Sequence, residues 1–469
     1  MGRKEKIIHS VQLHDITHQG LSVGRAEDGM VIFVQGGVPG DVADVMITRK
    51  RKGVWHGYVH QIIVESAFRT APRCKHFGIC GGCSWQNLAY VKQTEIKEGI
   101  VNSAMQRIAK VETATAEPML PCEEPYYYRN KLEFTFSSRR WMLYEEKDLE
   151  GVNNRNALGF HRPGIFDKIV DVEECFLQNI ISNEVRNALR EFTIARGYSY
   201  YDVRNHEGLL RNLIMKTNEQ NEVMAVLSFS QKDEEAMQAI RDFLTSHFKN
   251  IVSLWYAVNA KKNDSWHDVV CEKVYGDDFI YTRLDHVRFC IGPKSFFQTN
   301  RNQTERLYRL VEEYAGLSGT EVVYDLYCGV GSIGIYLAHK ASAVLGIEEI
   351  KEAIDDAHVN ATLNALSNCH FIAGDVLKIL NEELIAQYGR PDVMIIDPPR
   401  TGIHPEVIEQ ILRMAPARIV YVSCNPSTAA RDILLMSQAY HVDRYRPVDM
   451  FPMTNHIEVV TRLIIKQVE

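Results

Sequence analysis

Asp325-Leu-Tyr-Cys-Gly-Val-Gly331 is the strongest fold signal in this chain of 469 residues. It ends an apolar segment, residues 321–326, and its glycines begin a G-x-G-x-x-G pattern that Gly334 completes. Downstream, short apolar segments alternate with segments of helical spacing. This alternation predicts a parallel sheet with right-handed crossovers, an α/β domain of the Rossmann-like type over residues 291–469. The expected strands are residues 321–326, 343–347, 370–373, 393–396 and 418–422.

Two segments precede this domain. Residues 1–66 alternate apolar and polar positions between glycine-rich turns, which predicts a small β-barrel. Residues 67–290 are expected to form a mixed α+β central domain, whose topology the sequence does not define. Within it, residues 86–110 predict an amphipathic helix that packs on the C-terminal domain. Its expected apolar face consists of Val91, Ile96, Ile100, Met105 and Ile108.

The net charge of −7 argues against a nucleic-acid partner unless positive charge is concentrated locally. Two local groups are basic. One is the run Arg49-Lys50-Arg51-Lys52, and the other interleaves cations with aromatic residues between positions 126 and 140. Such interleaving suits single-stranded RNA, although a solvated loop beside half-buried strands explains it equally well. The second group consists of Arg129, Lys131, Arg139, Arg140, Tyr126, Tyr127, Tyr128, Phe134 and Phe136.

The compartment follows from cysteine use and from apolar runs. The ten cysteines are irregularly spaced and the charged amino terminus leads into no long apolar segment, so we expect a reducing cytosol. No run reaches the roughly 18 residues of a membrane helix, so no membrane partner is expected. Nothing in the sequence indicates an obligate protein partner.

Acidic side chains follow three expected strands. Asp325 ends the first, and a carboxylate there suits the cationic amino-acid head of S-adenosylmethionine better than the pyrophosphate of a dinucleotide. Glu348 follows the second strand, where it can accept hydrogen bonds from ribose hydroxyls, and Asp375 follows the third, near the expected adenine. The alternative is that these acids only cap the following helices.

A thiol stands at the same edge of the expected sheet. Ser423-Cys424-Asn425-Pro426 ends the strand 418–422, and Asp397-Pro-Pro-Arg400 ends the strand before it. A thiolate that adds to carbon 6 of uracil makes carbon 5 able to accept a methyl group, after which a base must remove the carbon-5 proton. This chemistry needs a cysteine of lowered pKa, for which we expect Cys424, and a ring pocket, for which we expect Asp397 and Arg400. Glu458, in His456-Ile-Glu458, is the candidate base. Taken singly, Cys424 would more often be a core residue and Glu458 a solvated one.

Three motifs together resemble the RNA (uracil-5-)-methyltransferase family. They are Asp397-Pro-Pro-Arg-Thr-Gly402, Ser423-Cys-Asn-Pro426 and His456-Ile-Glu-Val-Val460. The resemblance implies that Cys424 is the nucleophile and Glu458 the base. Tyr327 stands where Phe is commoner in the family, and Ser332 where some members have Asn. The residues that the resemblance assigns to S-adenosylmethionine are Gln298, Tyr327, Ser332, Glu348, Asp375 and Asp397.

A cysteine cluster precedes the expected helix. Cys74, Cys80 and Cys83 have the spacing C-x5-C-x2-C, and Cys175 is the best remaining fourth ligand. Four thiolates can hold zinc or a [4Fe–4S] cluster, and spacing alone slightly favours zinc. The family resemblance implies the [4Fe–4S] cluster. It also implies that residues 1–66 are a TRAM domain and that the substrate is one uridine of 23S ribosomal RNA.

Other functions remain open alternatives. Within the family, the substrate could be tRNA or another ribosomal uridine, although simple tRNA-acting members look like the catalytic half alone. Radical methylthiotransferases also join a TRAM domain to an iron–sulfur cluster, but they use C-x3-C-x2-C. Amino-group methyltransferases place an aromatic residue where this chain has Arg400. A non-catalytic RNA-binding scaffold is a remote fourth alternative.

Overall fold

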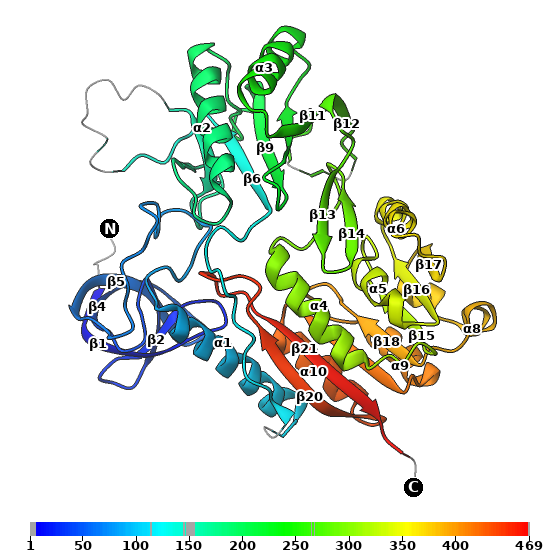
Figure 1. The fold of residues 1–469 in the computed structure, drawn as a ribbon. Coiled ribbons are helices and arrows are strands. Elements are labelled where there is room, and N and C mark those ends of the chain that lie inside the picture. The colour runs from blue at the N-terminus through cyan, green and yellow to red at the C-terminus, as the bar shows by residue number, and fades with distance from the viewer. Residues whose placement is uncertain are drawn as a thin grey trace.

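The computed structural model describes residues 6–112, 115–143, 146, 155–263, 265–266 and 268–467. A small barrel, a central sheet and a C-terminal sheet follow one another along the chain, and a long helix lies between the barrel and the C-terminal sheet (Figure 1). The expected fold class is therefore confirmed. The domain limits at residues 66 and 290 stay predictions.

The amino-terminal barrel is closed by five strands in the order β1-β2-β3-β5-β4. Its interior is filled by alternating residues such as Val11, Leu13 and Ile32. Strands β4 and β5 cross closely at Gly57, where a Cβ would lie 2.4 Å from the carbonyl oxygen of Met46. The strands are β1 (Lys6–Ile16), β2 (Ser22–Arg25), β3 (Val31–Gln35), β4 (Val42–Arg51) and β5 (Val54–Val64).

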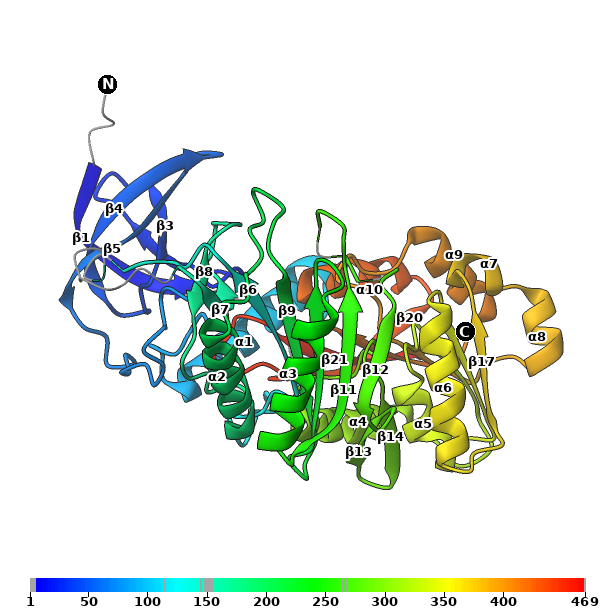
Figure 2. The same ribbon diagram turned by 90° about the horizontal axis from the view of Figure 1, so that it is seen from above.

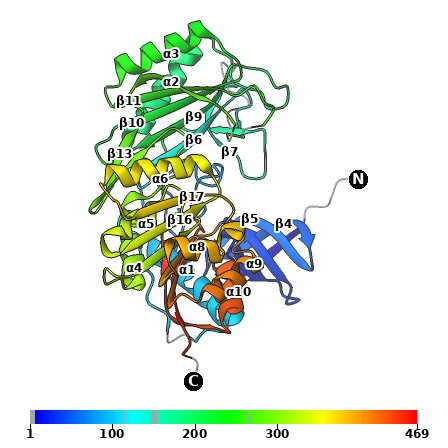
Figure 3. The same ribbon diagram turned by 90° about the vertical axis from the view of Figure 1, so that its right-hand side faces the viewer.

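The central domain is a seven-stranded sheet of order β12-β11-β10-β9-β6-β7-β8. Helices α2 (Ile180–Ala195) and α3 (Glu234–His247) cover the face that points away from the C-terminal sheet (Figure 3). The strands are β6 (Lys131–Ser137), β7 (Ala157–His161), β8 (Ile169–Asp171), β9 (Leu210–Thr217), β10 (Val223–Phe229), β11 (Ile251–Val258) and β12 (Cys271–Gly276).

Of the two interpretations of the basic and aromatic group between positions 126 and 140, half-buried strands hold for the phenylalanines of β6. Phe134 and Phe136 are completely or almost completely buried, because β6 turns their side of the strand toward the core. Arg139 is paired with Asp202, and Arg140 is paired with Glu146. These aromatic rings are therefore core residues, and these two cations are already neutralised.

Helix α1 (Tyr90–Ala104) continues as a short π-helical turn, Met105–Ala109, and packs against α10 of the C-terminal domain. The expected apolar face is partly wrong, since Val91 and Ile108 are exposed. The face that is buried instead carries two polar side chains, Gln93 and Lys97, together with Val101 and Ala104. Hydrophobic spacing could not find this face, because its polar members are satisfied by partners far away in the sequence.

The C-terminal sheet has seven strands in the order β17-β16-β15-β18-β19-β21-β20. The first five are parallel, which confirms the expected crossovers, and β21 and β20 add two antiparallel strands. Helices cover both faces (Figure 2). The strands are β15 (Val322–Leu326), β16 (Ala343–Glu348), β17 (Cys369–Ala373), β18 (Val393–Ile396), β19 (Arg418–Ser423), β20 (Tyr440–Val448) and β21 (Glu458–Ile465).

A two-stranded ribbon and helix α4 join the central sheet to the C-terminal one. The ribbon is formed by β13 (Ile280–Leu284) and β14 (Val287–Ile291), and α4 spans Arg301–Ala315. Among the described residues, no helix combines the length and apolar character needed to cross a membrane. The remaining helices are α5 (Ser332–Leu337), the 3-10 turn Ala338–Lys340, α6 (Lys351–Leu363), α7 (Val376–Ile379), α8 (Glu382–Tyr388), α9 (Pro405–Met414) and α10 (Pro426–Met436).

Candidate active site

Asp325 lies at the carboxyl edge of β15 and is 1% exposed. Its Oδ2 accepts a hydrogen bond of 2.8 Å from the Gly334 amide, whereas its buried Oδ1 accepts none from any described residue. Burial, together with Asp397 and Glu348, raises the pKa of Asp325 to about 7. A buried carboxylate oxygen without a donor fits a cationic ligand, whose charge would lower this pKa again.

The turn after β15 packs closely and needs glycine at Gly331. Gly331 has φ +73°, and a Cβ on it would lie 2.7 Å from the Phe371 ring. The Gly329 amide donates to Glu348 Oε2 at 3.2 Å, which ties the turn to the end of β16. The carboxylate that is expected to bind the ribose therefore also fixes the position of this turn.

The alternative that the acids cap helices is partly correct. Asp375 accepts a hydrogen bond from the Leu377 amide at 3.0 Å and is the N-cap of α7. Glu348 Oε1 accepts from the Ile350 amide at 3.0 Å, just before α6. Both side chains are half-buried at the carboxyl edge, so capping orients them there without enclosing them.

Three of the other four expected cofactor residues come from different elements. Tyr327 follows β15 in a left-handed conformation, φ +63°. Burial raises the pKa of its hydroxyl, and the neighbouring Asp375 adds a smaller contribution. Ser332 Oγ lies 2.7 Å from the hydroxyl of Tyr308 on α4. Gln298 is half-buried on the loop between β14 and α4, where its carbonyl oxygen accepts from Asn130 Nδ2 at 2.9 Å.

Cys424 and Glu458 stand on neighbouring strands. Cys424 follows β19, Glu458 begins β21, and the two strands pair antiparallel with Ser423 opposite Val459. The Cys424 side chain is half-buried and Glu458 is 7% exposed. Asp397, half-buried at the end of the adjacent β18, contributes to raising the pKa of both groups. The structure therefore brings these three expected residues together.

The expected low pKa of Cys424 is wrong for the protein without ligands. Burial raises its pKa to about 11, and the Glu458 and Asp397 carboxylates add to this effect, while Arg400 opposes it. Burial also raises the pKa of Glu458 well above its ordinary value, and that of Asp397 to about 7. Low dielectric disfavours the anionic forms here, so the site favours a thiol over a preformed thiolate at Cys424.

Arg400 is an exposed cation at the mouth of this site, and its Nη2 donates to His456 Nδ1 at 3.5 Å. Burial, then Arg400 and Arg129, lower the pKa of His456 to about 4. The imidazole is therefore neutral near pH 7, so the free positive charge at the mouth belongs to the guanidinium.

Sequence reasoning missed Asp432, which holds the loop that carries Arg400. Asp432 is completely buried on α10, where its Oδ2 accepts from the Ile403 amide at 2.8 Å and from the Tyr421 hydroxyl at 2.7 Å. Asn425 Nδ2 donates to the carbonyl oxygen of Arg400 at 3.1 Å, which joins the turn after Cys424 to the loop that carries Arg400. No periodic signal marks a buried acid within a helix, so the sequence alone could not have identified it.

The four expected ligand cysteines line one small cavity together with His76, Phe160 and Phe176. All four are free thiols, and burial raises the pKa of Cys80 and Cys83 to about 12. Donors already face two of the sulfurs, the Gly82 amide at 3.4 Å from Cys80 and Gln86 Nε2 at 3.2 Å from Cys83. Within the part of the chain that the structure describes, no group of three or more Cys, His, Asp or Glu is gathered tightly enough for a single metal ion.

Known proteins share this sequence almost end to end. The tRNA (uracil-5-)-methyltransferase family model matches residues 214–466, and the TRAM domain model matches residues 9–59. The chain belongs to the tRNA (uracil-5-)-methyltransferase family. A protein of Bacteroides thetaiotaomicron named as an RNA methyltransferase is 43% identical over 95% of this chain and 99% of its own length. One of Porphyromonas gingivalis is 44% identical over 97% of this chain and 99% of its own.

A solved structure extends the comparison. The tRNA (uracil-54, C5)-methyltransferase of Pyrococcus abyssi, in complex with S-adenosyl-L-homocysteine, has a TM-score of 0.76 and 29% identity over 97% of this chain and 99% of its own. The expected family, the S-adenosylmethionine-dependent methyltransferase activity on RNA and the amino-terminal TRAM domain are thereby confirmed.

Proposed function

We propose that this methyltransferase modifies carbon 5 of one uridine in 23S ribosomal RNA, with Cys424 as the nucleophile and Glu458 as the base. The observation that carries the proposal is the placement of both side chains on paired strands beside the buried acids of the donor site. A thiol and a carboxyl group are the two functions that carbon-5 methylation of uracil requires.

In this mechanism Cys424 first loses its proton to solvent, which reaches the half-buried side chain. The sulfur then bonds to carbon 6, and the ring electrons move onto the carbon-4 oxygen. Bound S-adenosylmethionine would supply an electrophilic methyl group. Carbon 5 of the enolate bonds to that methyl as the sulfur–methyl bond breaks, and S-adenosylhomocysteine is the leaving product. The Glu458 carboxylate takes the carbon-5 proton, the electron pair restores the ring double bond, and Cys424 leaves as thiolate. The target base must leave its stack to reach the thiol.

The residues proposed to hold S-adenosylmethionine divide by charge and position. Asp325, with its unpartnered buried oxygen, suits the ammonium group, and Glu348 suits the ribose hydroxyls. Asp397, at the end of β18, lies between the donor site and Cys424 and can meet either ligand. Gln298, Tyr327, Ser332 and Asp375 complete the proposed contacts.

We further propose that Cys74, Cys80, Cys83 and Cys175 hold a [4Fe–4S] cluster rather than zinc. The donor set fits, because all four thiols line one cavity and two already receive hydrogen bonds. A zinc ion would need its sulfurs gathered at about 2.3 Å from one point, whereas a four-iron cluster spaces them around a larger body. Since the cavity lies apart from Cys424, we assign the cluster no step of the reaction.

A second candidate substrate is tRNA. The Pyrococcus abyssi enzyme acts on tRNA, and its likeness covers almost all of this chain, including the barrel. An amino-terminal barrel is therefore no sign of a ribosomal substrate, which removes one argument for 23S RNA. The two candidates share the chemistry and differ in the RNA surface that presents the uridine.

Mapping of the product distinguishes these candidates. The enzyme is incubated with S-adenosylmethionine and, separately, with unmodified 23S RNA and unmodified tRNA, and 5-methyluridine is located by mass spectrometry. Product at one 23S position supports the proposal. Product in tRNA alone keeps the mechanism and rejects the substrate, and absence of 5-methyluridine from both RNAs rejects the reaction.

A further inference from the structure

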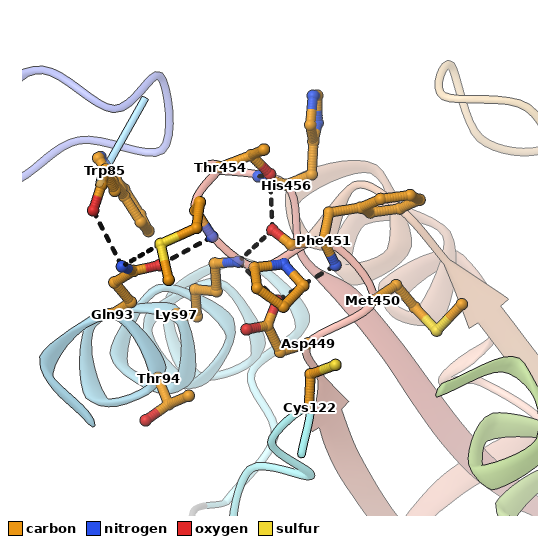
Figure 4. A network of polar contacts seen from close by, with 12 residues as sticks. Trp85, Gln93, Thr94, Lys97, Cys122, Asp449, Met450, Phe451, Thr454 and His456 are labelled. Atoms are coloured by element: carbon orange, nitrogen blue, oxygen red, sulfur yellow. Dashed lines mark hydrogen bonds and ion pairs between the residues drawn. The ribbon is translucent and has the colours of Figure 1, made fainter. Parts of the chain in front are cut away.

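The loop between β20 and β21 carries His456 and leads directly to Glu458. It is held from the opposite side by helix α1 through a buried ion pair, Lys97 with Asp449 (Figure 4). The Lys97 and Asp449 side chains are both 0% exposed, and their atoms Nζ and Oδ1 are 2.7 Å apart. The two residues lie 352 positions apart in the sequence.

The ion pair fixes both sides of one short turn. Lys97 Nζ also donates to the carbonyl oxygen of Phe451 at 3.1 Å, and Asp449 Oδ1 accepts from the Phe451 amide at 3.2 Å. The second carboxylate oxygen of Asp449 accepts from the Tyr90 hydroxyl at 2.9 Å. The main chain at Phe451 is thus held through its amide and its carbonyl by one pair of side chains.

Gln93, one turn earlier on α1, holds the next part of the loop. Its Oε1 accepts from the Met453 amide at 3.0 Å, and its Nε2 donates to the carbonyl oxygen of Leu88. Nε2 also donates to the carbonyl oxygen of Trp85 (Figure 4). Met453 has a left-handed backbone, φ +63°, which a non-glycine residue keeps only when its surroundings enforce it. Thr454 then donates to the Phe451 carbonyl at 2.8 Å and closes the turn.

We infer that Lys97 and Asp449, supported by Gln93, are positioning residues that set the loop leading into Glu458, the first residue of β21. A buried ion pair is a weak stabiliser compared with apolar residues of similar size, so stability alone gives little reason for this one. Directional bonds to the Phe451 main chain give a geometric reason instead. The inference rests on the proposed role of Glu458.

The inference predicts which chemical step suffers when the pair is lost. Cys424 lies between β19 and α10, outside this loop, so attack on carbon 6 continues. Removal of the carbon-5 proton requires Glu458 in place, so it slows. The methylated RNA–protein adduct then accumulates, which a general loss of folded enzyme would not produce.

The test uses the full-length double variant Lys97→Met/Asp449→Leu, which replaces the pair by apolar side chains and leaves no charge buried alone. The matched control is Lys92→Met/Glu95→Leu, which removes an exposed ion pair from the same helix. We expect the first variant to lose at least tenfold in kcat, with KM for RNA within threefold and a larger steady-state fraction of covalent adduct. The control should match the wild type in kcat and adduct.

A second readout needs no RNA and separates this inference from the proposed reaction. Glu458 helps to raise the pKa of Cys424, so its displacement should speed alkylation of Cys424 at pH 8 toward the rate of Glu458→Gln. Faster alkylation in the Lys97→Met/Asp449→Leu variant supports positioning, even if the wild type methylates no uridine. A folded variant with wild-type alkylation, or with wild-type kcat and adduct fraction, overturns it.

Discussion

Cys424 lies between two carboxyl groups, in surroundings that favour its neutral form. Glu458 and Asp397 both add to the burial that raises its pKa to about 11, and Arg400 alone among the named neighbours acts in the other direction. A half-buried thiol of raised pKa is less prone to adventitious oxidation, since the thiolate is the reactive species. The cation of the methyl donor and the flipped base must therefore change the electrostatics before the sulfur attacks.

Alkylation of the ligand-free protein measures this electrostatic state. Because the pKa of Cys424 lies near 11, its thiolate fraction should rise roughly tenfold per pH unit between pH 7 and pH 10. Glu458→Gln removes a group that raises this pKa, so the rate at pH 8 should increase. Peptide-resolved mass spectrometry after timed iodoacetamide treatment gives both rates. A rate that is already level at pH 8 would contradict the raised pKa.

The role of Cys424 itself is tested by Cys424→Ala. The variant should bind S-adenosylmethionine and RNA with wild-type affinity, because the thiol contacts neither before reaction, and should make no 5-methyluridine. Calorimetry and product analysis check the two parts. Cys369→Ala, which removes a half-buried thiol from β17, is the matched control and should keep its activity. Turnover by Cys424→Ala would exclude it as the nucleophile.

At the scale of single elements, the site consists of strand ends. β15, β16, β17, β18 and β19 each deliver at least one side chain to a common edge, and the antiparallel strand β21 adds Glu458. The glycine turn after β15 is closely packed. A Cβ added to Gly331, to Gly334 or to Gly346 of the adjacent β16 would lie less than 3 Å from another atom. This packing leaves the turn one conformation.

Gly331→Ala tests that packing. It should destabilise the protein by about 3 kcal/mol, since a left-handed φ costs an L-residue roughly 1–2 kcal/mol and the clash with Phe371 adds to this cost. Gly316→Ala is the matched control, because its φ of +55° is also left-handed but its Cβ would contact nothing closer than 3.9 Å. It should cost about 1 kcal/mol. Urea unfolding gives both values, and equal losses would remove the packing argument.

Elements with strong local signals could be predicted from the sequence. Strand Val393–Ile396 and its parallel neighbours are continuous apolar runs, and the glycine turn fixes where the first of them ends. The buried face of α1 could not be predicted, because Gln93 and Lys97 are satisfied by a loop more than 350 residues away. The raised pKa of Cys424 could not be predicted for a similar reason. It depends on residues at the ends of β18, β19 and β21, which lie together only in the folded sheet.

At the scale of the whole molecule, the loop between β20 and β21 is where the parts meet. Asn455 Nδ2 donates to the carbonyl oxygen of His18 in the barrel domain. The Met453 carbonyl accepts from the amides of Ser84 and Trp85, which follow Cys83 directly. From the central domain, the Tyr128 hydroxyl donates a hydrogen bond of 3.0 Å to the Pro452 carbonyl. The barrel, the loop of Cys74 to Cys83 and the central domain are therefore all hydrogen-bonded to the loop that leads into Glu458.

The cysteine cavity offers a prediction at this scale. Protein purified without oxygen should be brown, with broad absorbance near ~400 nm and about four irons per chain. Cys80→Ala should lose the colour and the iron, whereas Cys271→Ala, whose thiol lies outside the cavity, should keep both. Iron analysis and absorbance decide the matter. Stoichiometric zinc without iron would refute the cluster.

The shared role of Cys424 and Glu458 is tested most directly by intact-mass analysis of Glu458→Gln incubated with S-adenosylmethionine and substrate RNA. Without the base, the carbon-5 proton stays and the sulfur cannot leave, so the account predicts a stable adduct of protein and methylated RNA. The adduct should be absent when Cys424 is also replaced by alanine. A Glu458→Gln enzyme that releases 5-methyluridine at the wild-type rate, with no adduct, would contradict the account.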